Sequence, residues 1–403
     1  MQDLRKRVET ELRSNILSFW LKHAIDEECG GFRGRIANDL TIEPHADKGL
    51  ILNARILWTF AKAYGVYREP LFLATARRAY EYLCECFWDR EFGGVYWMLD
   101  FQGRPSDTKK RIYGQAFTVY SLAEYSHASG DSEAIARAMR LVEQIESSGH
   151  DDAHFGYFET YERDWTLAGD QRLSDVDLDE KKSMNTHLHL LEAYATLLRN
   201  HEDTMVRFRL RELIEIFLRH IIDPSNHHFI LFFDEQWRRR SEKISFGHDI
   251  EGSWLLCEAA EVLGDAEVLR RVRAEAVKMA QAVYAQGLDH DGGLMYELEP
   301  DGHFDADKHW WPQAEAVVGF LNAYQLSGQR HFVDAAERSW AFIEKYIVDR
   351  EHGEWFGLVS KAGVPDVSQD KVGPWKCPYH NSRTCFEVME RLDGLGRRGS
   401  EQV

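Results

Sequence analysis

The sequence of 403 residues predicts an all-α protein, an (α/α)6 barrel in which six inner helices stand inside a ring of six outer helices. A turn motif built from an acidic residue and glycines recurs six times along the chain. The intervals of about 60–70 residues between its copies each hold two helices and a loop. A last helix at the C-terminal end favours a closed ring over an open helical solenoid. Short β-hairpins are expected in the loops at one end of the barrel.

The turn motif places an aspartate a few residues before one or two glycines and continues into a short strand rich in aromatic residues. Its copies begin at Asp26, Asp89, Asp152, Asp223, Asp289 and Asp349. The copy at Asp223 lacks the glycines but keeps the alternating apolar residues of the strand. Glycine adopts a positive φ at little steric cost, and a tight turn needs such a φ. Each copy therefore predicts a turn followed by a strand or hairpin.

Helical periodicity fills the intervals between the turns, with apolar residues at i, i+3, i+4 and i+7. The pattern predicts helices at residues 51–65, 116–130, 188–200, 253–264 and 314–328. Four of these segments end at a glycine, which is a helix-stop signal. No Pro-, Ser- or Gly-rich linker interrupts the series. We therefore expect one catalytic domain over residues 1–393 and a frayed tail over residues 394–403.

Composition narrows the class of function. A formal net charge of −18 disfavours nucleic acid and anionic membranes as partners. The sequence has no apolar stretch of the roughly 20 residues that span a membrane, and its first segment carries charges throughout, unlike a signal peptide. The six cysteines follow no zinc or disulfide-framework spacing. We expect a cytoplasmic protein, and the 12 tryptophans are compatible with a sugar ligand.

Polar residues gather at the predicted starts of the inner helices. His248 and Glu251 lie at i and i+3 and share a helix face, and Trp254 follows three residues later. A carboxylate close to an imidazole raises its pKa and fixes its orientation. A lone histidine is more often a cap or a core residue. Beside a glutamate and a tryptophan, a functional role for His248 is favoured.

Two other helix starts carry comparable pairs. Asn185 and His189 are i, i+4 neighbours on one face, and so are Trp311 and Glu315. Tryptophans at such positions are often packing residues. Their place beside polar groups in the same layer indicates a pocket that binds a polar ligand with an apolar face.

The last helix start is reached by a loop that two prolines stiffen, and this loop brings Trp375 and His380 to the same layer. Arg55 and Tyr113 occupy the layer in the first two repeats. A metal site could be assembled from a set of His and Glu side chains: His189, His248, Glu251 and His380. Because no HExxH or similar signature is present, we do not expect a metal.

Four segments carry a family resemblance: KSMNTHLHLLEAYA, FGHDIEGSWLL, HWWPQAEAVVGFLNAYQ and PWKCPYHNSR. They resemble the cellobiose 2-epimerase branch of the N-acylglucosamine 2-epimerase superfamily, and the similarity runs from about Arg55 to Arg383. The resemblance implies an (α/α)6 barrel without metal or redox cofactor. It also implies epimerisation at C2 of the reducing-end glucose of β-1,4-linked disaccharides such as cellobiose and lactose.

The resemblance further implies roles for single residues. His248 and His380 are the acid/base pair, with His189 as a third catalytic residue. The groups around the opened aldehyde end are His189, Arg55, Asn185 and Tyr113. Glu251 supports His248. The residues that hold the sugars are Trp311, Trp375 and Glu315, and Trp254 is carried over with them.

Other functions remain open from the sequence. A mannose/glucose aldose–ketose isomerase or an N-acylglucosamine 2-epimerase would use the same barrel. A glycoside hydrolase needs two carboxylates that flank the bond, for which Glu251 and Glu315 are the only candidates in this layer. A non-catalytic sugar-binding protein would keep the tryptophans without needing His248 and His380. A small-molecule sugar is the expected partner, and a monomer or weak homodimer is the expected assembly.

Overall fold

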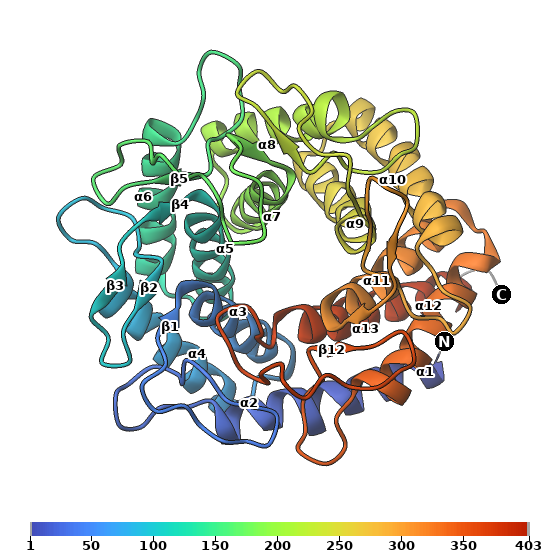
Figure 1. The fold of residues 1–403 in the computed structure, drawn as a ribbon, viewed down its shortest axis with the longest axis horizontal. Coiled ribbons are helices and arrows are strands. Elements are labelled where there is room, and N and C mark those ends of the chain that lie inside the picture. The colour runs from blue at the N-terminus through green and yellow to red at the C-terminus, as the bar shows by residue number, and fades with distance from the viewer. Residues whose placement is uncertain (1, 401–403) are drawn as a thin grey trace.

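The computed structural model describes residues 2–400 and confirms the predicted barrel (Figure 1). The inner helices are α3 (Leu50–Tyr67), α5 (Ile112–Ser129), α7 (Met184–Asn200), α9 (Phe246–Leu263), α11 (Trp310–Ser327) and α13 (Tyr379–Ser400). Each packs on the next, and α13 also packs on α3. The ring is therefore closed and is not an open solenoid.

The outer ring begins with one long helix of three parts, which are α1 (Gln2–Glu11), a π-helical segment (Leu12–Leu17) and α2 (Ser18–His23). The other outer helices are α4 (Pro70–Tyr82), α6 (Ser132–Ser148), α8 (Thr204–Ile216), α10 (Ala266–Gln286) and α12 (Arg330–Phe342). Three of them continue into π-helical segments at Leu83–Phe87, Phe217–Ile221 and Ile343–Ile347. Within the described residues, no helix combines the length and the apolar character that a membrane crossing requires.

The ends of the inner helices test the predicted boundaries. Three glycine stops are confirmed as left-handed residues directly after α5, α9 and α11: Gly130, Gly264 and Gly328. Helix α3 instead runs past Gly65, and Arg68 takes the left-handed conformation with φ 57°. The starts lie up to seven residues earlier than the apolar periodicity indicated, as at Phe246 in α9. The first turns hold polar residues, so the apolar pattern does not extend into them.

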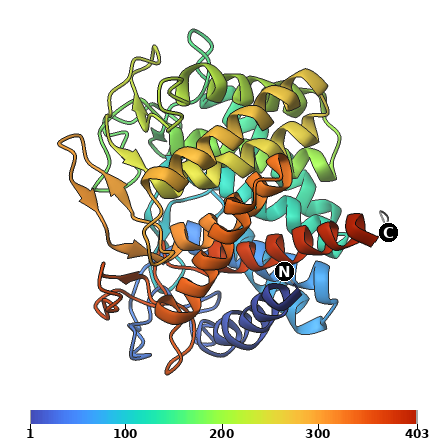
Figure 2. The same ribbon diagram turned by 90° about the vertical axis from the view of Figure 1, so that its right-hand side faces the viewer.

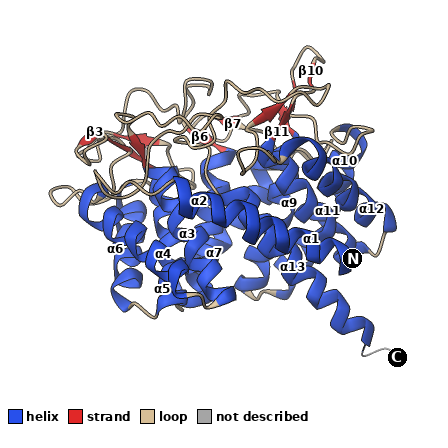
Figure 3. Cartoon of the chain, turned by 90° about the horizontal axis from the view of Figure 1, so that it is seen from below, coloured by secondary structure: helices blue, strands red, loops and turns tan. Residues whose placement is uncertain are grey.

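The strands lie together at one end of the barrel (Figure 3). They are β1 (Lys48–Gly49), β2 (Met98–Leu99), β3 (Pro105–Asp107), β4 (Lys110–Arg111), β5 (Thr160–Tyr161), β6 (Lys182–Ser183), β7 (Phe232–Phe233), β8 (Ile244–Ser245), β9 (Glu297–Leu298), β10 (Phe304–Asp305), β11 (Lys308–His309) and β12 (Leu358–Val359). The strand before each inner helix pairs antiparallel with a strand that follows the next outer helix. A bridge between Ile36 and Val372 makes the same link where the ring closes.

Each repeated turn is closed by one antiparallel bridge, including Ile222 to Phe229 in the copy without glycines. In the third copy the turn residue is Asp151 and not Asp152, because the Asp151 carboxylate accepts the turn's N–H groups. A buried lysine pairs with the turn aspartate in five copies: Lys48–Asp26, Lys110–Asp89, Lys182–Asp151, Lys308–Asp289 and Lys371–Asp349. Four of these lysines stand two residues before an inner helix, so the pair fixes the helix start to its turn.

These turn aspartates predict a loss of stability in acid. Burial alone would raise the pKa of Asp89, but hydrogen bonds from Arg163 and Lys110 outweigh burial and hold that pKa well below its usual value. The pKa is also lowered at Asp26, Asp151, Asp289 and Asp349. A carboxylate with a lowered folded-state pKa stabilises the fold above about pH 4, and the contribution is lost as the pH falls through the folded-state pKa.

We therefore expect the free energy of unfolding, measured by urea titration, to decrease as the pH falls from about 5 to about 2. The Asp89→Asn variant should be less stable at neutral pH and should show a shallower decrease. A free energy of unfolding that stays constant over this range would contradict the expectation.

The segment expected to be a frayed tail overlaps the last inner helix, since α13 continues to Ser400. Its end projects from the barrel near the N-terminal helix (Figure 2). Residues 401–403 lie outside the described residues.

Candidate active site

The second and sixth residues of each inner helix lie one turn apart on the same helix face. In chain order these pairs are Ile51/Arg55, Tyr113/Phe117, Asn185/His189, Gly247/Glu251, Trp311/Glu315 and His380/Thr384. Most of the residues that the sequence singled out occur in this register. Consecutive inner helices are neighbours in a closed ring. Side chains at these two positions therefore lie together at the strand end of the bore, the space enclosed by the six inner helices.

The predicted histidines meet in this layer. The His248 ring lies 4.7 Å from the Trp311 ring and the His380 ring lies 5.5 Å from it, between ring centroids. His189 packs edge-on against Tyr113 at 5.1 Å. Two imidazoles from helices that are far apart in sequence thus face one tryptophan.

Each of the three histidines has a different partner at Nδ1. His189 contacts Glu192 Oε2 at 2.9 Å, and His380 contacts Glu315 Oε1 at 2.6 Å. The Nδ1 of His248 instead contacts the hydroxyl of Ser245 at 2.8 Å.

This arrangement corrects the expected support of His248 by Glu251. The Glu251 carboxylate accepts a hydrogen bond from Arg383, and its Oε1 lies 3.8 Å from Nδ1 of His380. The spacing i, i+3 permits a contact with His248. The guanidinium, however, offers a full opposite charge to a buried carboxylate, and a hydrogen bond to a charged group is the stronger one.

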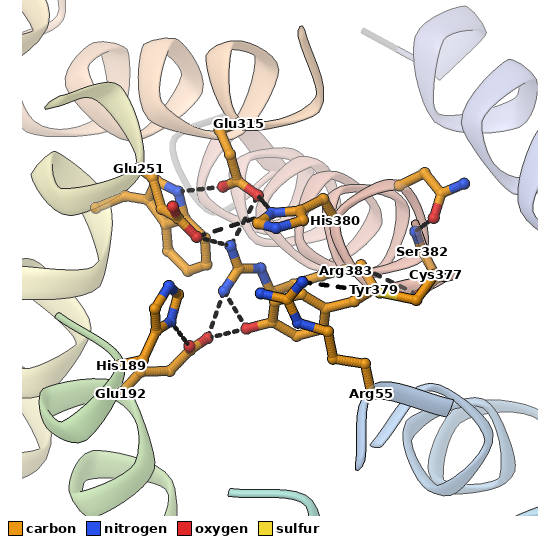
Figure 4. Close-up of polar contacts among 12 residues, drawn as sticks. Arg55, His189, Glu192, Glu251, Glu315, Cys377, Tyr379, His380, Ser382 and Arg383 are labelled. Atoms are coloured by element: carbon orange, nitrogen blue, oxygen red, sulfur yellow. Dashed lines mark hydrogen bonds and ion pairs between the residues drawn. The ribbon is translucent and has the colours of Figure 1, made fainter. Parts of the chain in front are cut away.

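The guanidinium of Arg383 is the centre of this buried polar network (Figure 4). It donates hydrogen bonds to three carboxylates, those of Glu192, Glu251 and Glu315. The Tyr379 hydroxyl donates to Glu192 as well. Among the described residues, Glu251, Glu315 and His380 have ligand types that suit a metal ion and ligand atoms within 4.8 Å of one another. The cation beside these carboxylates in the structure is the guanidinium.

Burial and charge set the protonation states of the network. Burial would raise the pKa of Glu192, but the charge of Arg383 and the bond from His189 outweigh burial and lower that pKa to about 2. Burial and the neighbouring Glu315 raise the pKa of Glu251 to about 7. Burial lowers the pKa of His248 to about 3, and burial together with the charge of Arg55 lowers the pKa of His380. Both imidazoles are therefore neutral near pH 7 and have a lone pair to accept a proton.

Other buried polar groups remain open to a ligand. Arg55 donates to the Tyr113 hydroxyl at 3.0 Å and stacks over the ring of Phe117. It has no carboxylate partner in the described part of the chain. Among the described residues, neither its Nε nor the Oδ1 of Asn185 has a hydrogen-bond partner, although both atoms are buried. Buried polar atoms are normally satisfied, so these atoms mark a place for a polar ligand.

The tryptophans divide into two groups. Trp375 is 40% exposed and packs against Trp97 and Tyr113 at the mouth of the bore. Trp254, expected to contact the sugar, is only 1% exposed, and its indole N–H donates to Glu315 at 3.1 Å. Glu315 itself is fully buried, so it holds His380 and Arg383 in place. The surfaces that remain for a ligand are those of Trp311 and Trp375.

Sequence reasoning missed Ser245, Glu192 and Arg383 as site residues. Their spacing in the sequence could have identified them, because Ser245 precedes His248 by three residues and Glu192 follows His189 by three. Arg383 follows Tyr379 by four residues on the helix that carries His380. These spacings place the side chains on shared helix faces.

Comparison with known proteins places the chain in a family. The model of the N-acylglucosamine 2-epimerase (GlcNAc 2-epimerase) family matches residues 30–383. The cellobiose 2-epimerase of Bacteroides fragilis is 44% identical over 387 residues, which cover 96% of this chain and 98% of that protein.

Solved structures agree with the sequence matches. The cellobiose 2-epimerase from Bacillus thermoamylovorans B4167 superposes with a TM-score of 0.93 at 38% identity, covering 97% of this chain and 100% of that one. A D-mannose isomerase superposes with a TM-score of 0.84 at 20% identity, covering 96% of this chain and 97% of that one, and this likeness shows the fold alone. The chain belongs to the N-acylglucosamine 2-epimerase family of carbohydrate epimerases.

Proposed function

We propose that this protein is a cellobiose 2-epimerase, which interconverts glucose and mannose at the reducing end of β-1,4-linked disaccharides such as cellobiose and lactose. The observation that carries the proposal is the pair of neutral imidazoles, His248 and His380, that face Trp311 in one bore. The identity with cellobiose 2-epimerases over nearly the full chain supports the same reaction.

The chemistry requires three steps. First the sugar ring opens, as a proton moves from the anomeric hydroxyl to the ring oxygen and the C1 aldehyde forms. A base then takes the C2 proton, and the electron pair of the C–H bond forms the C1–C2 double bond of a cis-enediolate with negative charge on O1. Return of a proton to the opposite face of C2 inverts the centre. His248 and His380 would take and return these protons.

The negative charge on O1 must be offset while it exists. Arg55 carries a buried positive charge that no carboxylate neutralises among the described residues, and His189 stands beside Tyr113 in the same layer. Preorganised donors of this kind stabilise a developing oxyanion. Because a proton leaves and a proton returns, the reaction is redox-neutral, and we propose that it needs no cofactor and no metal.

The remaining expectations form part of the proposal. Residues 1–393 would act as one catalytic domain, since the site residues come from the single ring of helices and from the segments that lead into them. All six cysteines are free thiols, which supports a reducing compartment such as the cytoplasm. A monomer or weak homodimer would suffice, because one chain supplies the whole set.

The contacts of the two glutamates argue against a glycoside hydrolase. Such an enzyme needs one carboxylate on each side of the bond that it cleaves. Glu251 and Glu315 lie on adjacent helices, and both accept hydrogen bonds from the same nitrogen of Arg383. They therefore support His380 from one side and do not flank a ligand.

Incubation with cellobiose in D2O, without added metal, tests the proposed function. We expect the C2 proton signal of the reducing-end sugar to disappear and a glucosyl-mannose product with deuterium at C2 to appear in the NMR spectrum. A ketose product would identify an aldose–ketose isomerase, and free glucose would identify a hydrolase. Either product in place of the C2 epimer overturns the proposal.

Gly247 leaves the space that Trp311 occupies. A Cβ on Gly247 would lie 2.6 Å from Cη2 of Trp311, so Gly247→Ala must displace the indole. We expect kcat/KM with cellobiose to fall by up to about 100-fold, as a misplacement of roughly 1 Å can cause. The control is Gly65→Ala, where the space is open and helix propensity favours alanine. Equal activity of the two variants would contradict this role of Gly247.

A further inference from the structure

Ser245 stands at a position where serine normally caps a helix. It is the residue directly before α9, in extended conformation, but its hydroxyl makes no capping bond to the backbone of the described chain. Ser183 occupies the same position before α7, and its hydroxyl accepts the N–H of Thr186 at 3.1 Å. The two serines are thus equivalent in the repeat but use their hydroxyls differently.

The hydroxyl of Ser245 is directed instead to the side chain of His248. The two atoms, Oγ and Nδ1, are 2.8 Å apart, and Ser245 is 1% exposed. Water has little access to the serine, so its hydroxyl is the hydrogen-bond partner of Nδ1 of His248. Giving up a cap costs stability, and serine is among the best capping residues. Ser245 does not cap the helix, and its hydroxyl contacts His248 instead.

The partner at one ring nitrogen decides what the other nitrogen can do. A neutral imidazole carries one proton. If Nδ1 carries that proton and donates a hydrogen bond to Ser245, Nε2 has a free lone pair. His189 and His380 differ, because each has a carboxylate at Nδ1, and a carboxylate can only accept a hydrogen bond. A hydroxyl adds no negative charge, and it can accept a hydrogen bond from Nδ1–H.

We propose that Ser245 is a positioning residue of the epimerase: its hydroxyl accepts a hydrogen bond from Nδ1–H of His248 and so keeps the Nε2 lone pair free to accept a proton from the sugar. This inference rests on the proposed acid/base role of His248. It also explains why His248 is the third residue of its helix, outside the register of second and sixth residues. From the third position the imidazole reaches back to the residue before the helix, as side chains at that position do in capping boxes.

Burial lowers the pKa of His248, so the imidazole is neutral before it takes up a proton. No carboxylate of the described chain contacts its ring, so the imidazolium that forms after proton uptake is not held by a counter-charge. Such a group returns its proton readily. A histidine of this kind suits a reversible reaction, in which the same imidazole must act in both directions.

The first test is the tautomer of His248 in the wild-type protein. Protein labelled with 15N-histidine should give an imidazole signal in which Nδ1 carries the proton and Nε2 does not, assigned by its loss in His248→Asn. A proton on Nε2 overturns the proposal whether or not the enzyme epimerises cellobiose. A wild-type protein that does not exchange the C2 proton, by contrast, would refute the proposed function. That result would not affect the measured tautomer of His248.

The second test uses three serine variants. Ser245→Ala should lower kcat by about 10–100-fold, the loss typical when the partner that orients a metal-binding histidine is removed, with little change in KM. It should also give a mixture of both His248 tautomers. Ser245→Thr keeps the hydroxyl and should recover most of kcat and the single tautomer. Ser183→Ala removes a true cap and should lower the urea midpoint without altering the His248 signals. A Ser245→Ala enzyme with wild-type kcat and tautomer would overturn the proposal.

Discussion

Alanine at His248 or His380 is expected to lower kcat for C2 epimerisation by about 100-fold to 10,000-fold, the usual contribution of a general acid or base. Each variant loses one of the two imidazoles that face Trp311, so a proton cannot be both removed from and returned to C2 on opposite faces. The measurement is deuterium incorporation at C2 of cellobiose in D2O, followed by NMR, together with initial rates.

The control for these variants is a histidine outside the bore. His331 lies on the outer helix α12 and bonds to Gln281, so His331→Ala should epimerise cellobiose at the wild-type rate. Circular dichroism should show the same helix content in all three variants. C2 exchange that persists at the wild-type rate in both His248→Ala and His380→Ala would refute the assignment of the pair.

Arg383→Met is expected to reduce the free energy of unfolding by about 3–5 kcal/mol, the cost of leaving buried charges without their partner. The side chain is 2% exposed and forms ion pairs with Glu192, Glu251 and Glu315. Urea titration measures the change. The loss should be smaller near pH 5 than near pH 8, because carboxylates that lose their cation take up protons more easily as the pH falls.

Two further arginine variants sharpen this result. Arg383→Lys keeps the charge but loses the forked geometry, so its stability should lie between those of the wild type and Arg383→Met. Arg270 forms an exposed ion pair with Glu267, and Arg270→Met should cost no more than about 1 kcal/mol. If Arg383→Met were as stable as Arg270→Met, the buried network would not have the role in stability that its contacts indicate.

Much of the architecture follows from local sequence. The six turns, the glycine stops and the polar first turns of the inner helices depend on residues within a few positions of one another. The order of six equal repeats then predicts which helices are neighbours in a ring. For this reason the layer that contains Arg55, His189 and His380 could be predicted before its geometry was known.

The partners of the histidines depend on the tertiary structure. His248 stands between Ser245 at i−3 and Glu251 at i+3, and helix geometry allows it to contact either one. Arg383, 132 residues beyond Glu251, decides between them. Its guanidinium binds the Glu251 carboxylate, and the imidazole of His248 is left with the serine. The sequence determined that His248 lies in the layer of polar groups, and only the closed ring, which brings the charge of α13 against α9, determined what holds it.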